Sequence, residues 1–122
     1  MDRRVRQVVE ILGSEWHEGV CVPELASRVG LGASRLEHLF KANVRTTIRD
    51  YVRERRLAEA AAMLTAGHER ISSIAARVGF PQVSNFNHAF KKRFGMAPRE
   101  YREQASIDEV STFEQGNTEI AK

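Results

Sequence analysis

The sequence predicts an all-α protein of about seven helices, in which two helix-turn-helix subdomains are joined by a long linker helix. Three observations lead to this prediction. Apolar residues recur at helical spacing over most of the 122 residues. Two stretches of similar sequence follow one another about 50 residues apart. Glycines stand where the short helices should end. The ordered domain is expected to cover residues 1–104.

The first helix-turn-helix is predicted at about residues 22–43, after a helix from about Asp2 to Trp16. The apolar face of that leading helix consists of Val5, Val8, Val9 and Leu12. Leu25, Ala26 and Val29 face inward from the next helix, which Gly30 ends. The inward residues of the third helix are Leu36, Leu39 and Phe40.

A long linker helix is predicted at about residues 47–65. Thr47 and Asp50 resemble a capping box at its start, and Ala66-Gly67 ends it. At 1.5 Å per residue the helix is roughly 27 Å long. Adjacent major grooves on one face of B-DNA lie about 34 Å apart, so this helix could hold two recognition helices one turn apart.

The second helix-turn-helix is predicted at about residues 71–94. Ile71, Ile74, Ala75 and Val78 mark the first of its helices, which Gly79 ends. The inward residues of its second helix are Phe86, Ala89, Phe90 and Phe94. Gly95 ends that helix, and Pro98 suits the first position of another.

The two subdomains are copies of one unit. Residues 25–31 match residues 74–80 at an offset of 49, and Ser34 to Tyr51 match Ser84 to Tyr101 at an offset of 50. The third and sixth helices therefore carry equivalent outward residues. We expect Ser34, Arg35, Glu37, His38, Ser84, Asn85, Asn87 and His88 to contact DNA bases. Phosphate contacts are expected from Lys41, Lys91, Lys92 and Arg93.

Charge favours an anionic partner. The formal net charge is +3, but residues 1–104 carry 18 basic and 12 acidic side chains, or +6. Residues 105–122 carry −3 and are predicted to form a disordered acidic tail. A solvated basic surface is the plainer reading of the same charge.

Other functional classes lack their motifs. Neither a phosphate-binding glycine loop nor a metal-binding pair of histidines is present, and the single cysteine, Cys21, cannot form an internal disulfide. We therefore expect no enzyme, no metal and no cofactor. The sequence has no apolar run of the roughly 20 residues that a membrane helix needs, so a cytoplasmic protein is expected.

The sequence resembles the AraC/XylS family of bacterial transcription regulators over roughly Val5 to Arg102. The matching positions are Arg56-Leu57, Ile74-Ala75, Val78-Gly79-Phe80, Ser84, Phe86, Phe90-Lys91, Gly95, Pro98 and Tyr101-Arg102. The resemblance implies two recognition helices in successive major grooves of double-stranded DNA. It also implies activation of transcription through RNA polymerase. Since one chain carries two recognition helices, we expect it to bind as a monomer.

The sequence departs from the family pattern at several positions. Arg45 and Ile48 stand where the second copy has Gly95 and Pro98. His38 and His88 stand where many relatives have arginine, and Gln82 replaces a common acidic helix cap. Two alternatives remain open. The chain is a helical protein–protein interaction module, which Glu37 favours, or it is the C-terminal DNA-binding fragment of a larger ligand-responsive regulator.

Overall fold

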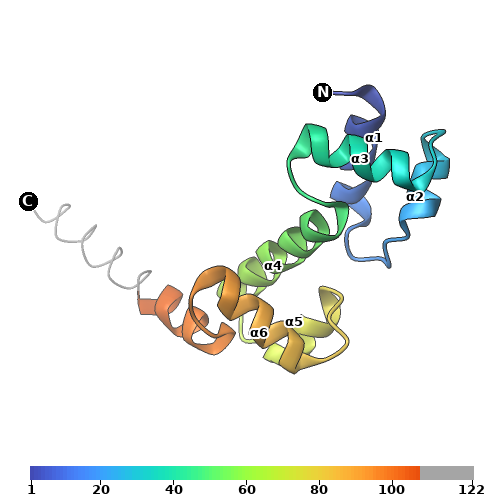
Figure 1. The fold of residues 1–122 in the computed structure, drawn as a ribbon. Coiled ribbons are helices and arrows are strands. Elements are labelled where there is room, and N and C mark those ends of the chain that lie inside the picture. The colour runs from blue at the N-terminus through green and yellow to red at the C-terminus, as the bar shows by residue number, and fades with distance from the viewer. Residues whose placement is uncertain (108–122) are drawn as a thin grey trace, which may run out of the picture. The chain divides into compact units, whose positions relative to one another are not determined.

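The computed structural model describes residues 1–107. Seven helices and no strand make up this part of the chain (Figure 1), which confirms the predicted all-α class. The labelled helices are α1 (Arg3–Glu15), α2 (Val22–Arg28), α3 (Ala33–Val44), α4 (Ile48–Ala66), α5 (Ile71–Arg77) and α6 (Val83–Phe94). A further helix covers residues 98–107. The chain divides into two compact units, Met1–Arg56 and Leu57–Lys122, with the boundary inside α4.

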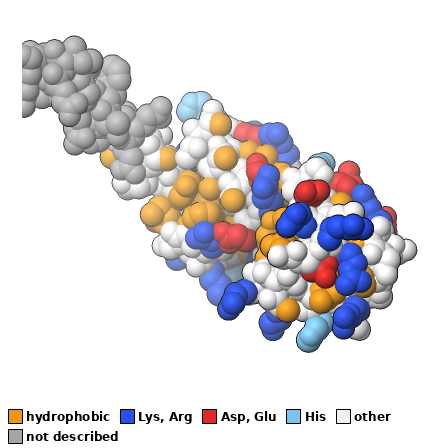
Figure 2. Space-filling model, turned by 90° about the horizontal axis from the view of Figure 1, so that it is seen from above, with side chains coloured by type: hydrophobic (Ala, Val, Ile, Leu, Met, Phe, Trp, Pro, Cys, Tyr) orange, Lys and Arg blue, Asp and Glu red, His pale blue; other side chains and the backbone are white. Residues whose placement is uncertain are grey.

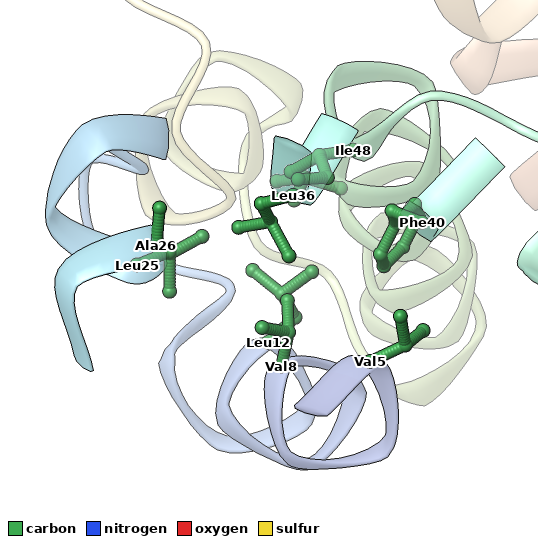
Figure 3. Close-up of a cluster of buried hydrophobic side chains, with 9 residues drawn as sticks. Val5, Val8, Leu12, Leu25, Ala26, Leu36, Phe40 and Ile48 are labelled. Carbon is green, nitrogen blue, oxygen red and sulfur yellow. The ribbon is translucent and has the colours of Figure 1, made fainter. Parts of the chain in front are cut away.

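One apolar cluster forms the core of the first unit (Figure 3). Its buried side chains are Val5, Val8, Leu12, Leu25, Ala26, Leu36, Phe40, Ile48 and Val52. Leu36 and Phe40 of α3 are completely buried. Because these two residues fix one side of α3 in the core, the opposite side of the helix is left for polar residues. Trp16, the last residue of the predicted leading helix, lies beyond the end of α1 and is half-buried.

The second unit has a core of the same kind. Its buried side chains are Leu57, Ala60, Ala61, Leu64, Ile74, Ala75, Val78, Phe86, Phe90 and Pro98. As predicted, Phe86 and Phe90 of α6 are completely buried, whereas Phe94 is half-buried. The core thus orients α6 as Leu36 and Phe40 orient α3.

The turn between the two helices is the same in both units. After α2, the Leu31 amide donates to the Ala26 carbonyl at 2.8 Å, and Gly30 has a φ of 74°. After α5, the Phe80 amide donates to the Ala75 carbonyl at 2.9 Å, and Gly79 has a φ of 93°. This hydrogen bond closes a helix through a left-handed residue, which is why glycine stands at the turn.

An aromatic pair repeats at the predicted offset of 50. Phe40 and Tyr51 meet edge to face, with ring centroids 5.6 Å apart and planes at 81°. Phe90 and Tyr101 do the same at 5.3 Å and 83°. In each pair, a ring of the recognition helix packs against a ring of the helix that follows it. Edge-to-face packing of this kind stabilises the contact beyond the burial of apolar surface.

Both recognition helices end in the same way, although their sequences differ there. Arg45 follows α3 with a φ of 67°, and its amide donates to the Lys41 carbonyl at 2.9 Å. Gly95 follows α6 with a φ of 81°, and its amide donates to the Lys91 carbonyl at 2.7 Å. Arg45 is the one residue other than glycine with a positive φ in the described part of the chain. The substitution of arginine for glycine therefore leaves the end of α3 unchanged.

In each unit one arginine side chain donates hydrogen bonds to backbone carbonyls that are distant in sequence. In the first unit, Arg56 donates to the carbonyls of Trp16 and Glu18, both at 3.3 Å. In the second unit, Arg102 donates to the carbonyl of Leu64 at 3.1 Å and to that of Glu69 at 2.5 Å. A cation at a helix C-terminus also interacts favourably with the helix dipole. Each arginine thereby fixes the chain that leaves the preceding helix, α1 or α4.

Helix starts use different caps. The Asp2 carboxylate accepts from the Arg4 amide at 2.8 Å, and the hydrogen bonds from the side chain and backbone of Arg4 lower the pKa of Asp2. The Thr47 hydroxyl accepts from the Asp50 amide at 3.1 Å, as the predicted cap of the long helix requires. Neither α3 nor α6 has a side-chain cap, since Gly32 and Gln82 occupy those positions.

The end of the described chain differs from the expectation of a tail beginning at residue 105. The last helix continues to residue 107, and the Ser106 hydroxyl donates to the Arg102 carbonyl at 3.2 Å. Residues 108–122 of that expected tail lie outside the described residues. Within residues 1–107, no helix combines the length and apolarity needed to cross a bilayer. The same residues contain no cluster of side chains able to hold a metal ion.

Candidate nucleic-acid interface

The outward face of α3 forms one side of an open groove in the first unit. Ser34, Glu37, His38 and Lys41 line it, at successive spacings of three, one and three residues. This spacing places all four side chains on one face of a helix. The groove has a volume of about 950 Å³. The sequence-based candidates Ser34, Glu37 and His38 are thus brought together beside the predicted phosphate contact, Lys41.

Arg35 is not among the residues that line this groove. It follows Ser34 directly and therefore points about 100° away around the helix. It is exposed. The sequence grouped Arg35 with its neighbours because all of them avoid the core, but a helix surface outside the core is wider than one face.

The start of α4 supplies the other side of the groove. Thr47 and Arg49 line it together with the apolar residues Val20, Val22, Ile48 and Val52. The sequence predicts Thr47 as a helix cap, and no sequence motif singles out Arg49. One signal was available, because the N-terminus of a helix attracts anions and a nearby arginine adds to that attraction. At the offset of 50, Arg99 is the counterpart of Arg49 in the second unit, where it pairs with Glu103 at 3.6 Å.

Arg56 also lines the groove, but its donors are directed elsewhere. Its guanidinium is held by the Trp16 and Glu18 carbonyls, and burial lowers the pKa of Arg56. Those hydrogen bonds hold the loop between α1 and α2. We therefore regard Arg56 as a structural residue of the groove wall.

On α6, the corresponding residues are Ser84, Asn87, His88 and Lys91, and all four are exposed. Since Phe86 and Phe90 fill the core as Leu36 and Phe40 do, the four polar residues occupy the equivalent helix face. Asn85, the counterpart of Arg35, is off that face, and its side-chain amide donates to the Gln82 side chain at 3.3 Å. Before Lys91, the second recognition face thus carries no Asp, Glu, Lys or Arg side chain.

Basic residues gather at the C-terminal end of α6. Lys91, Lys92 and Arg93 are consecutive and exposed, and α6 contains no acidic residue. The Arg93 guanidinium lies over the Phe94 ring, 4.8 Å from its centroid. This cation–π contact limits where the Arg93 side chain can reach. Lys91 and Lys92 are therefore better placed than Arg93 to meet phosphates.

The distribution of charged side chains does not by itself locate the candidate nucleic-acid interface. In the view of Figure 2, Lys and Arg side chains are interspersed with Asp and Glu side chains. Several surface cations have carboxylate partners, such as Arg28 with Glu15 at 3.1 Å and Arg77 with Glu69 at 2.6 Å. The Glu15 carboxylate raises the pKa of Arg28. What distinguishes α3 and α6 is the placement of polar side chains on one exposed face of a helix that follows a tight turn.

The match to a protein family covers the part of the chain with this geometry. A family model described as a helix-turn-helix domain matches residues 25–104. The chain belongs to this helix-turn-helix family. The match begins in α2 and ends in the last helix, so it includes both turns and both candidate recognition helices.

Named relatives place this helix-turn-helix chain among transcription factors. It is 33% identical over 97 residues to the probable transcription factor PqrA of Proteus vulgaris, covering 80% of each chain. It is 39% identical over 69 residues to the transcriptional activator RhaR of Yersinia pseudotuberculosis. That second match covers 57% of this chain but only 24% of RhaR.

Solved structures of transcriptional regulators have the same fold as this chain. A transcriptional regulator of Chromobacterium violaceum, described as containing an AraC-type DNA-binding domain, superposes with a TM-score of 0.77. It is 27% identical and is matched over 84% of this chain and 91% of its own. The resemblance to the AraC/XylS family seen in the sequence is thereby confirmed for this helix-turn-helix chain.

Proposed function

We propose that this chain binds a specific double-stranded DNA sequence and regulates transcription from it. The observation that carries the proposal is the repeated recognition unit. Both copies share the turn hydrogen bond, the aromatic pair, the left-handed helix end and an exposed polar helix face. A recognition helix presented after such a turn fits the major groove. The AraC-type family and the name of PqrA support the same function.

Each recognition helix reads one half-site. In the first, Ser34, Glu37 and His38 face base edges, and a glutamate accepts a hydrogen bond from cytosine N4. In the second, Ser84, Asn87 and His88 do so, and an asparagine pairs with adenine through one donor and one acceptor. Arg35 and Asn85 contact the edges of these sites.

Phosphates are held at the ends of the recognition helices. Lys41, Lys91, Lys92 and Arg93 supply the predicted contacts, with Arg93 the most restrained of the four. Arg49 joins them, because it lines the same groove as Lys41. Such contacts fix the register of the protein on DNA without reading its sequence.

One chain carries two recognition helices and binds as a monomer to a non-palindromic site, with half-sites about one helical turn apart. It acts in the cytoplasm as an activator that contacts RNA polymerase. The name of RhaR, a transcriptional activator, supports this role, although the chain spans only 24% of that relative.

Selection of binders from random duplexes tests the proposal. We expect a non-palindromic sequence that the chain protects over two adjacent major grooves. Replacing Asn87 and His88 with alanine should relax the preference in one half-site and leave the other intact. The matched control is Ser14→Ala on α1, whose hydroxyl bonds within its own helix. A symmetric site occupied only by a dimer would contradict monomeric binding.

The same selection decides the rival function. Glu37 places a negative charge in the α3 groove, which favours a protein partner over DNA. If no duplex is enriched over the starting pool, the interaction module becomes the better reading.

A further inference from the structure

Val83 is an apolar residue in an unusual place. It is the first residue of α6, and its side chain is 42% exposed. The other large exposed hydrophobic residues within residues 1–107 are Met1 and Ile107, at the two ends of the described chain. Single exposed hydrophobic residues are common on protein surfaces, so exposure alone does not make Val83 functional. Its position at the start of the recognition helix α6 is the reason to consider it further.

Helix propensity does not account for a valine here. Valine is a weaker helix former than alanine, and 42% of the surface of Val83 stays open to solvent. The residue before it, Gln82, has an extended backbone with φ −120° and ψ 128°. Val83 therefore stands at the leading end of α6, where the helix begins.

Val83 lies beside the first of the proposed base contacts, Ser84, at the start of α6. Val83 precedes Asn87 by four residues, so the two side chains lie one above the other along α6. The N-terminal residues of a recognition helix are those that approach base edges. The neighbouring side chains, Gln82, Ser84 and Asn85, are all polar. Val83 thus gives this end of the helix one methyl-bearing surface among hydrogen-bonding groups.

We propose that Val83 reads the C5-methyl group of a thymine in the half-site bound by α6. Thymine is the only base that presents a methyl group in the major groove, and apolar side chains recognise it by contact. The inference rests on the proposed DNA binding and adds a base to its specificity. The first unit has Ala33 at the matching position, half-buried at the start of α3. The methyl contact should therefore occur in one half-site only.

Thymine can be replaced by deoxyuridine, which differs only in lacking this methyl group. We would take the duplex selected by the parent chain and substitute deoxyuridine at each thymine in turn. At one thymine, the parent should lose about fourfold in affinity, the value of burying one methyl-sized group. Val83→Ala should bind the thymine duplex about fourfold more weakly and lose most of the preference for thymine over deoxyuridine at that position.

Two further variants sharpen the result. Val83→Thr keeps one methyl group and should retain part of the thymine preference. Ser14→Ala on α1, outside the proposed interface, should keep the full thymine preference of the parent. Because Val83 is exposed and alanine favours a helix, we expect thermal unfolding of Val83→Ala to match the parent.

The possible outcomes distinguish methyl recognition by Val83 from the proposed DNA binding on which it rests. If the parent and Val83→Ala show the same ratio of thymine to deoxyuridine affinity at every position, Val83 does not read a methyl group, while DNA binding stands. If the parent selects no duplex at all, both proposals are wrong.

Discussion

Arg45 has the left-handed backbone conformation of Gly95, its counterpart 50 residues later, with φ values of 67° and 81°. A side chain in this conformation brings Cβ close to the following carbonyl oxygen, at a cost of roughly 1–2 kcal/mol. Glycine avoids that cost, although it gains freedom in the unfolded chain.

We therefore expect Arg45→Gly to raise the free energy of unfolding by about 1 kcal/mol. The reverse change, Gly95→Ala, should lower it by a similar amount. No atom lies within 4 Å of a Cβ built on Gly95, so the loss would come from backbone conformation rather than from a clash. Urea unfolding of both variants measures the effect, and equal stability of Arg45→Gly and the parent would show that the backbone at Arg45 carries no strain.

Phe40 and Phe90 occupy equivalent positions in the two units, and both are completely buried. Phe40→Ala in the first unit and Phe90→Ala in the second should each cost about 3–5 kcal/mol of stability through lost burial and a residual cavity. Thermal unfolding monitored by circular dichroism measures the loss. Phe94→Ala is the control, since Phe94 is only half-buried and should cost less. A melting temperature unchanged in Phe90→Ala would contradict the role of that ring in the core.

Lysines at the ends of the recognition helices should affect affinity without affecting specificity. Lys41→Ala or Lys91→Ala should weaken binding to all duplexes alike and reduce the slope of log K against log salt by about one unit. Arg49→Ala should behave in the same way, because Arg49 shares the α3 groove with Lys41. Titrations at several salt concentrations test this. A change of preference at a single base pair would instead place the residue among the base contacts.

His38 and His88 occupy equivalent places on α3 and α6, and both are exposed. An imidazole can donate to or accept from a base edge in the major groove. The double variant His38→Gln, His88→Gln should therefore shift the preference at one base pair in each half-site, which selection from random duplexes measures. Retention of the parental preference would leave recognition to Ser34, Arg35, Glu37, Asn85 and Asn87.

The repeat explains why the fold could be predicted from the sequence. Apolar spacing located the cores, and glycine marked the turns at Gly30 and Gly79, because few other residues adopt their backbone conformation at low cost. The unchanged end of α3 was harder to foresee, since Arg45 gives no local sign of a left-handed residue. Its amide nevertheless donates to the Lys41 carbonyl as the Gly95 amide donates to the Lys91 carbonyl.

The candidate site was predicted only in part. Periodicity separates residues that face the core from those that do not, and it correctly left Ser34, Glu37 and His38 exposed. It does not say which exposed residues share a groove, so Arg35 was grouped with them and Arg49 was overlooked. The carbonyl contacts of Arg56 and Arg102 join residues 33 to 40 positions apart, which no local pattern reveals.

The single tryptophan, Trp16, lies in the first unit, where its indole ring meets the His17 ring edge to face at 5.4 Å. Its carbonyl accepts the hydrogen bond from Arg56. Emission excited at the red edge of protein absorbance, where tyrosine contributes little, therefore reports on the first unit alone. Comparing that signal with ellipticity during unfolding distinguishes sequential melting of the two halves from a single cooperative step, without any added dye or label.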